Sequence, residues 1–167
     1  IMGGGLGLMP KRDRFYEELN RLPNVKTTLI AGRNEKLYRR LKGKYENIEV
    51  VGFTDRVYDY MAWADLMLSK PGGITLFETI FSELPILAWA PFLQQEINNA
   101  RFLRRTGIGR VAEKEPERCL AAIRELLYND EALAWMSGNM RQMKSQLEME
   151  SADRVFEALA RGERVCA

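Results

Sequence analysis

The chain has 167 residues, 46% of them hydrophobic and 29% charged, a balance typical of one globular domain. Lysine and arginine total 25 against 23 acidic residues, and a net charge of only +2 argues against a surface dedicated to nucleic acid. The sequence contains no histidine, which excludes histidine zinc sites, Ser-His-Asp triads and a histidine general base within this chain. Proton transfer would need a carboxylate here, or a base supplied by another domain.

The chain opens on a glycine loop, Gly3–Gly7, with almost no strand in front of it. We therefore expect a truncated first strand and a chain that is a fragment of a longer protein. The alternative is a true N-terminus in which Ile1 remains from a tag.

Strand-like and helix-like segments then alternate along the sequence. Helical spacing of apolar residues predicts helices over 13–22, 34–44, 57–63, 73–81, 94–105 and 116–128. Short runs rich in apolar and β-branched residues predict strands over 25–31, 48–53, 65–69, 85–89 and 108–111. This alternation predicts an α/β fold, a Rossmann-like parallel sheet with helices on both faces.

The last part of the chain reads as helix over 131–160. Its apolar residues recur at steps of three and four, namely Leu133, Met136, Met140, Met143 and Leu147. Such a stripe favours core packing over a cofactor site. We divide the chain into a Rossmann-like domain over 1–130 and a helical segment over 131–167 that packs on it.

Two further features concern the compartment. Cys119 and Cys166 form no CxxC pair and are expected to be free thiols, which favours a cytoplasmic protein. No run of about 18 apolar residues is present, so no membrane-spanning helix is predicted.

Glycines stand where the predicted strands end, at Gly3–Gly7, Gly32 and Gly72–Gly73. Ligands of open parallel sheets bind beyond the carboxyl ends of the strands. Glycine lets backbone N–H groups approach a phosphate, and the helix that follows adds partial positive charge. For each loop alone, a tight strand-to-helix turn is the favoured explanation. The first lacks the third glycine of the dinucleotide fingerprint, since Pro10 stands there, and no P-loop motif occurs.

Acidic and amide side chains follow two of these strand ends. Glu78 lies on the first turns of the helix that Gly72 and Gly73 open, where a carboxylate can accept two hydrogen bonds from a ribose diol. The alternative is an acid favoured by the helix dipole. Gln95 and Glu96 follow the strand at 85–89 and suit sugar hydroxyls, although a polar helix start explains them equally.

Taken in order, these motifs resemble one family. The resemblance is carried by four stretches: MGGGLGL at 2–8, AGRNEKL at 31–37, the stretch 50–78 with its KPGGITLFE motif, and the run 83–102 with Gln95-Glu96. They resemble the C-terminal, donor-binding half of GT-B fold glycosyltransferases of the family 28 type. That family includes diacylglycerol galactosyl- and glucosyltransferases, which look closer, and the enzyme that adds N-acetylglucosamine to the lipid-linked peptidoglycan precursor.

The resemblance implies a UDP-sugar site. Gly4, Gly5 and Gly7 would face the donor phosphates and the acceptor, Arg33 would line the nucleotide site, and Phe53 and Thr54 would meet the uracil. Gly72, Gly73 and Thr75 would line the diphosphate, Glu78 would hold the ribose, and Gln95 with Glu96 would contact the donor sugar. No catalytic residue, metal site or cofactor is expected in this chain, and the base belongs to an N-terminal acceptor domain absent from it.

Two departures from the family pattern affect the loops. The family's glycine before the proline of the strand at 85–89 is replaced within Ser82-Glu83-Leu84, which costs about 1 kcal/mol if that residue needs a positive φ. The glycine before Gln-Glu is replaced by Gln94, so the identity of the sugar cannot be read.

The expected function is metal-independent transfer of a hexosyl group from a UDP-sugar to a lipid acceptor, as part of a longer chain; the isolated fragment would be inactive. The acceptor would be bound through the missing domain or a partner subunit, at the cytoplasmic membrane face, with no nucleic-acid partner. The alternatives are half of a UDP-sugar epimerase, or a non-catalytic or split-subunit binding module. Arg101, Arg104, Arg105 and Arg110 could contact anionic lipid, but we favour a solvated helix end.

Overall fold

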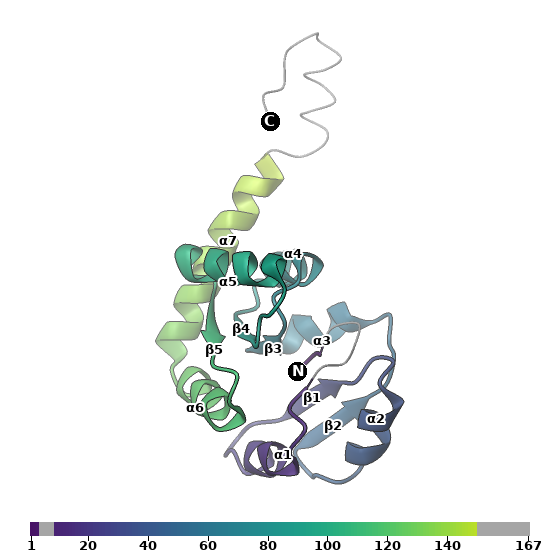
Figure 1. Ribbon diagram of the computed structural model, residues 1–167. Coiled ribbons are helices and arrows are strands. Elements are labelled where there is room, and N and C mark those ends of the chain that lie inside the picture. Colours follow the sequence, from purple (N-terminus) through teal and green to yellow (C-terminus); the bar gives the residue numbers. More distant parts are fainter. Residues whose placement is uncertain (4–8, 150–167) are drawn as a thin grey trace.

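The computed structural model describes residues 1–3 and 9–149. Its helices are α1 (Asp13–Asn20), α2 (Glu35–Leu41), α3 (Val57–Trp63), α4 (Gly73–Phe81), α5 (Gln94–Thr106), α6 (Pro116–Leu127) and α7 (Asp130–Met149). Its strands are β1 (Thr27–Ile30), β2 (Ile48–Val51), β3 (Met67–Ser69), β4 (Ile86–Trp89) and β5 (Gly109–Ala112). The α/β alternation predicted from the sequence is confirmed (Figure 1).

All the strand pairs are parallel. β1 pairs with β2, and β4 lies between β3 and β5. Met2 joins the two groups, because it forms parallel bridges to both Ile30 and Ser69. The chain therefore starts at the centre of the sheet, moves outward to β2, and returns to the other side at β3. Such a reversal creates a crevice at the carboxyl ends of the central strands.

Helices cover both faces of the sheet, as the pattern predicted. On β4, Leu87 packs in the core formed with α1, α2 and α6. Ile86 and Ala88, on the opposite face, pack with side chains of α4, α5 and α7. Successive strand residues point to opposite faces, and β4 is buried on both, as expected for a central strand of a parallel sheet.

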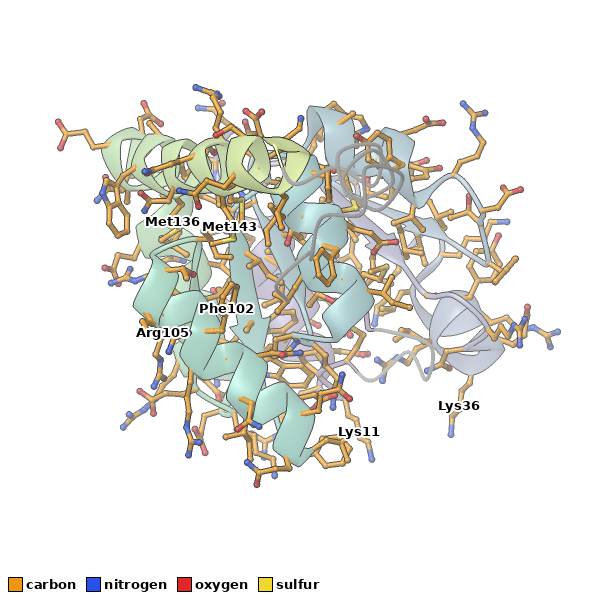
Figure 2. All side chains as sticks on the ribbon, turned by 90° about the horizontal axis from the view of Figure 1, so that it is seen from above. Lys11, Lys36, Phe102, Arg105, Met136 and Met143 are labelled. Atoms are coloured by element: carbon orange, nitrogen blue, oxygen red, sulfur yellow. The ribbon has the colours of Figure 1, made fainter. Side chains whose placement is uncertain are left out.

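The methionine stripe of α7 is part of the core. Met136 packs with the core of α1 and α6, and Met140 is fully buried against α4 and α5. Met143 of α7 and Phe102 of α5 are partly buried and pack against the same cluster (Figure 2). The rest of the predicted terminal helix, together with Cys166, lies outside the described residues, whereas Cys119 is buried as a free thiol.

Some boundaries differ from the predicted ones. The helix predicted over 34–44 ends at Leu41, because Lys42 leaves the helical region and Gly43 has a φ of 69°. Asn34 caps this helix as its sequence position suggests, since its side-chain oxygen accepts a hydrogen bond of 3.0 Å from the Leu37 N–H. The strand predicted over 48–53 ends at Val51, which leaves the following residues free to form a loop at the edge of the sheet.

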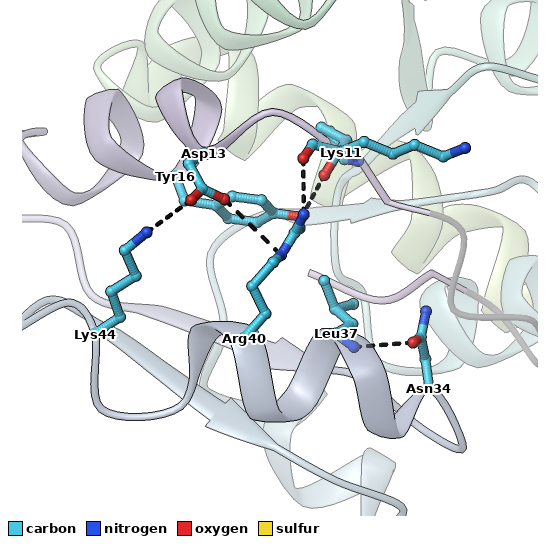
Figure 3. Close-up of polar contacts among 8 residues, drawn as sticks. Lys11, Asp13, Tyr16, Asn34, Leu37, Arg40 and Lys44 are labelled. Carbon is cyan, nitrogen blue, oxygen red and sulfur yellow. Dashed lines mark hydrogen bonds and ion pairs between the residues drawn. The ribbon is translucent and has the colours of Figure 1, made fainter.

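The residues that follow the first glycine loop are held between α1 and α2 (Figure 3). Arg40 of α2 donates a hydrogen bond of 2.7 Å to the carbonyl oxygen of Lys11. The hydroxyl of Tyr16 donates one of 2.8 Å to the carbonyl oxygen of Pro10. Burial raises the pKa of Tyr16 to about 12, so its hydroxyl keeps the proton that it donates. These bonds fix the path by which the chain leaves the central crevice.

Glu83 lies between α4 and β4, in the segment where the family has a glycine and this chain does not. The structure shows that its backbone φ is positive. Its φ is 54°, a left-handed conformation that costs a non-glycine residue about 1 kcal/mol. Its carboxylate meets two cations of α7, with Arg141 at 2.9 Å and Lys144 at 3.6 Å. The side chain therefore connects the end of α4 to α7, in a conformation that glycine would adopt more readily.

Changing Glu83 to glycine or to alanine separates these two effects. Both changes remove the ion pairs, which contribute about 0–1 kcal/mol each where the groups are exposed. Only the change to glycine also removes the backbone strain. We expect Glu83→Gly to be more stable than Glu83→Ala by about 1 kcal/mol in urea unfolding. Equal stability of the two variants would contradict a strained backbone at this position.

Candidate functional site

The turn between β3 and α4 presents open backbone N–H groups at the crevice. Gly72 is the N-cap of α4 and has no side chain to cap it, so the N–H groups of the first turn are available to a ligand. The Gly72 N–H donates a hydrogen bond of 2.8 Å to the carbonyl oxygen of Lys70, which tightens the turn around Pro71. Asn99 of α5 donates a hydrogen bond of 2.8 Å to the carbonyl oxygen of Pro71. The turn is therefore held from α5.

The start of α5 lies against the same turn. A Cβ atom added to Gly73 would lie 3.5 Å from Nε2 of Gln95, so the two residues are neighbours across the crevice. Glu96 is buried, and its Oε2 accepts hydrogen bonds from the N–H groups of Phe92 (3.0 Å) and Leu93 (3.4 Å). This carboxylate stabilises the start of α5 in the manner of a capping box. The structure thus brings together a predicted diphosphate residue and a predicted sugar residue.

Thr75 and Glu78 are three residues apart on α4, so both lie on one side of the helix. The Thr75 hydroxyl oxygen would be 3.8 Å from a Cβ atom added to Gly72. Glu78 is partly buried, and burial raises the pKa of its carboxyl above the ordinary value. In the part of the chain that the structure describes, the carboxylate of Glu78 has no hydrogen bond or ion pair. Its carboxylate is therefore available to a ligand at the cost of partial desolvation.

A second cluster lies at the ends of β1 and β2. The guanidinium of Arg33 lies over the Phe53 ring, 5.3 Å from its centroid, and Phe53 is 69% exposed. A flat exposed ring with a cation above it can stack on a planar ligand such as a base. The Thr54 hydroxyl accepts a hydrogen bond of 3.0 Å from the Arg56 N–H, so it serves its own loop. Among the described residues, no hydrogen bond or ion pair links this cluster to the α4 turn.

The predicted residues Gly4, Gly5 and Gly7 lie outside the described residues, and their assignment stays a prediction. The side chain of Lys70 received no role from the sequence, although it belongs to a stretch that carries the resemblance. Lys70 was part of the KPGG motif, but only the fold shows that it lies beside Phe92 and Glu96. In the described ranges 1–3 and 9–149, no group of three His, Cys, Asp or Glu side chains could hold a metal ion.

A cavity of about 430 Å³ lies away from these residues. It is lined by the amino ends of β1 and β3, including Thr27 and Met67, and by parts of α3 and α7. The polar groups that converge at the carboxyl ends of the strands therefore define the candidate site better than the volume of this cavity does. No described helix is both long and apolar enough to cross a bilayer.

Comparisons with known proteins identify a family for this chain. The model of the glycosyltransferase family 28 C-terminal domain matches residues 9–153. The processive diacylglycerol beta-glucosyltransferase of Staphylococcus carnosus is 34% identical over 148 residues, covering 86% of this chain and 38% of the relative. That of Staphylococcus epidermidis is 33% identical over 129 residues, covering 75% and 33%. The chain thus spans about two fifths or less of the length of these relatives.

Solved structures share the fold. A glycotransferase of kitacinnamycin has a TM-score of 0.67 at 24% identity, over 87% of this chain and 38% of the other. Acinetobacter baumannii MurG has a TM-score of 0.64 at 20% identity, over 84% and 44%. The rhamnosyltransferase SpnG, solved with thymidine diphosphate, has a TM-score of 0.64 at 18% identity, over 85% and 39%. Together with the family match, these findings show that the chain belongs to the glycosyltransferase family 28 C-terminal domain family.

Proposed function

We propose that this chain is the donor-binding part of a UDP-sugar-dependent glycosyltransferase that transfers a hexosyl group to a lipid acceptor. The observation that carries the proposal is the proximity of the open N-terminus of α4 at Gly73 to Gln95 of α5, at the point where the strand order reverses. Relatives named as processive diacylglycerol beta-glucosyltransferases support glucose as the sugar and diacylglycerol as the acceptor.

In this proposal the chain holds the donor and stabilises the leaving group. The diphosphate meets the first N–H groups of α4 and the Thr75 hydroxyl, where the helix dipole favours the negative charge that grows as the glycosidic bond breaks. Glu78 accepts hydrogen bonds from the ribose, Phe53 lies against the uracil, and Gln95 contacts the sugar. The chain contains no histidine, so we assign activation of the acceptor hydroxyl to a residue outside it. No metal or cofactor is part of the proposal.

We also propose that the protein is located in the cytoplasm, at the inner face of the cell membrane. The arginines of α5 are exposed, and Arg105 points away from the body of the molecule (Figure 2). Arg110 pairs with Glu125 at 2.8 Å, which lowers the net charge of this surface. More pelleting of the chain with anionic than with neutral vesicles would support membrane contact by this surface. Equal pelleting with both would remove the contact from the proposal.

Calorimetry with the 167-residue chain tests donor binding. We expect UDP to bind with a Kd of roughly 1 mM or below, a range typical of enzyme substrates. ADP, which keeps the diphosphate and replaces the uracil, is the matched control and should bind more weakly. A folded chain that binds neither nucleotide, or binds both equally, would overturn the assignment of a UDP-sugar site.

A further inference from the structure

Lys70 lies in an unusual position at the end of β3. Its side chain is only 11% exposed, although lysine ammonium groups normally remain in water. Its Nζ lies 3.9 Å from the centroid of the Phe92 ring and 3.7 Å from Oε2 of Glu96. Neither contact is a hydrogen bond, and within the described ranges Nζ has no hydrogen-bond acceptor. A nearly buried ammonium with three unused donors is costly unless a further partner arrives.

Glu96 does not use up the charge of Lys70. The same Oε2 atom already accepts hydrogen bonds from the N–H groups of Phe92 and Leu93, and these bonds orient the carboxylate toward the start of α5. The lysine therefore contributes charge to this pair without a direct hydrogen bond. Because the lysine stem is flexible and its head is a point charge, a small rotation brings the ammonium to another anion without unfolding the loop.

The open N-terminus of α4 follows Lys70 closely along the chain and offers a place for such an anion. Lys70 is separated from Gly72 only by Pro71, and the carbonyl oxygen of Lys70 closes the turn by accepting from the Gly72 N–H. Backbone N–H groups, a helix dipole and a lysine at one turn are a combination that binds phosphate groups. The one cation among the predicted site residues is Arg33. It is exposed and lies over Phe53 in the second cluster, at the ends of β1 and β2, so Lys70, not Arg33, is the cation at the α4 turn.

We propose that Lys70 binds the diphosphate of the donor and that Glu96 is the counter-ion which holds the ammonium in place until the donor arrives. This inference rests on the proposed function and adds to it a residue that neutralises the leaving group. Because Glu96 also shapes the loop in front of Gln95, the lysine connects the diphosphate to the segment assigned to the sugar. Binding of the phosphate end should thereby affect the sugar end of the site.

The test compares UDP with uridine, which lacks both phosphates, on the 167-residue chain by calorimetry. In the wild type, UDP should bind more tightly than uridine. Lys70→Met keeps the length and apolar contacts of the side chain and removes its charge. It should weaken UDP binding about tenfold or more, a loss expected for a charge-assisted contact, and leave uridine binding within about twofold. Lys70→Arg should restore part of the preference for UDP.

Two further variants make the test specific. Glu96→Gln removes the counter-ion and should strengthen UDP binding without changing uridine binding. Lys36→Met removes an exposed lysine of α2 that points away from the molecule, and it should change neither (Figure 2). The dependence of UDP binding on salt should be weaker in Lys70→Met than in the wild type, because one cation fewer faces the ligand.

The outcomes separate the two proposals. Equal losses for UDP and uridine in Lys70→Met, or no loss for UDP, would overturn the role of Lys70 while leaving the donor site intact. If Lys70→Met fails to fold by circular dichroism, the comparison of Lys70→Arg and Glu96→Gln with the wild type decides instead. An unchanged preference for UDP over uridine in both of these variants would overturn the role. If the wild type binds neither UDP nor uridine, the proposed function itself is overturned.

Discussion

Changing Glu78 to glutamine should weaken UDP binding by about 10- to 100-fold, the loss expected for hydrogen bonds to a charged group. A carboxylate can accept from both ribose hydroxyls, whereas an amide offers one oxygen. Calorimetry with UDP and with 2′-deoxy-UDP measures the effect. The wild type should prefer UDP, and Glu78→Gln should lose most of that preference.

A matched control for this change is available on α2. Glu35 is an exposed acid in the first turn of that helix, and its partner is Arg39, 3.6 Å away. Glu35→Gln should bind both nucleotides as the wild type does. If Glu78→Gln also keeps the wild-type affinity and the preference for the ribose, Glu78 does not hold the ribose.

The environment of Glu78 also predicts a dependence on pH. Burial raises the pKa of this carboxyl, so the folded chain takes up the proton more readily than the unfolded chain does. The affinity for uridine should therefore fall as the pH drops through this raised pKa.

The raised pKa of Glu78 also affects the stability of the fold. The stability contributed by the protonated carboxyl is present at low pH and is lost as the pH rises through its pKa in the folded chain. Glu78→Gln, which stays neutral, should be at least as stable as the wild type at pH 7 in chemical unfolding; a loss of stability would contradict this.

Changing Gly109 to alanine should destabilise the chain strongly, because the space for a side chain is taken by a neighbouring strand. A Cβ atom at this position would lie 2.3 Å from the carbonyl oxygen of Ile86 and 2.7 Å from its Cγ2. Gly109 is paired with Ile86 in the parallel register of β4 and β5, so a backbone atom would have to move. We expect a loss of about 3 kcal/mol, or a fall in Tm of roughly 6–12 °C. Thermal unfolding monitored by circular dichroism measures it.

Gly138 provides the control for this prediction. It lies within α7, is exposed, and a Cβ atom there would meet nothing within 4 Å. Alanine is the better helix former, so Gly138→Ala should stabilise the chain by about 0.5–1 kcal/mol. The same chemical change would then have opposite signs at the two positions. A stable Gly109→Ala variant would show that the spacing of β4 and β5 is not as tight as described.

The sequence predicted local structure well where the signals were local. The bounds of α3 and α4 agree with the predicted ones, because turn residues and apolar spacing mark both ends. The glycine turn before α4 was also placed correctly, since the Pro-Gly-Gly sequence is a local turn signal. By contrast, the helix predicted to reach residue 44 stops at Leu41, where the conformation of Lys42 and Gly43 overrides the apolar pattern.

The candidate site could be predicted only in part. The sequence placed Gly73, Glu78 and Gln95 at strand ends, but only the packing of α5 on the α4 turn shows that Gly73 and Gln95 are neighbours. The position of Lys70 between Phe92 and Glu96 has no local signature, because it depends on two segments that meet through the sheet. Glu96 looked like a sugar ligand from its sequence position. In the fold its Oε2 caps α5, and a contact between Glu96 and the sugar stays a prediction.

Binding of UDP at the carboxyl ends of the strands can be located residue by residue in an NMR titration of the isotope-labelled chain with UDP. We expect the largest amide shift changes in the turn at 72–75, at Glu78 and at the start of α5 around Gln95. Shift changes confined to the cavity beside the amino ends of β1 and β3, around Thr27 and Met67, would contradict a donor site at the carboxyl ends.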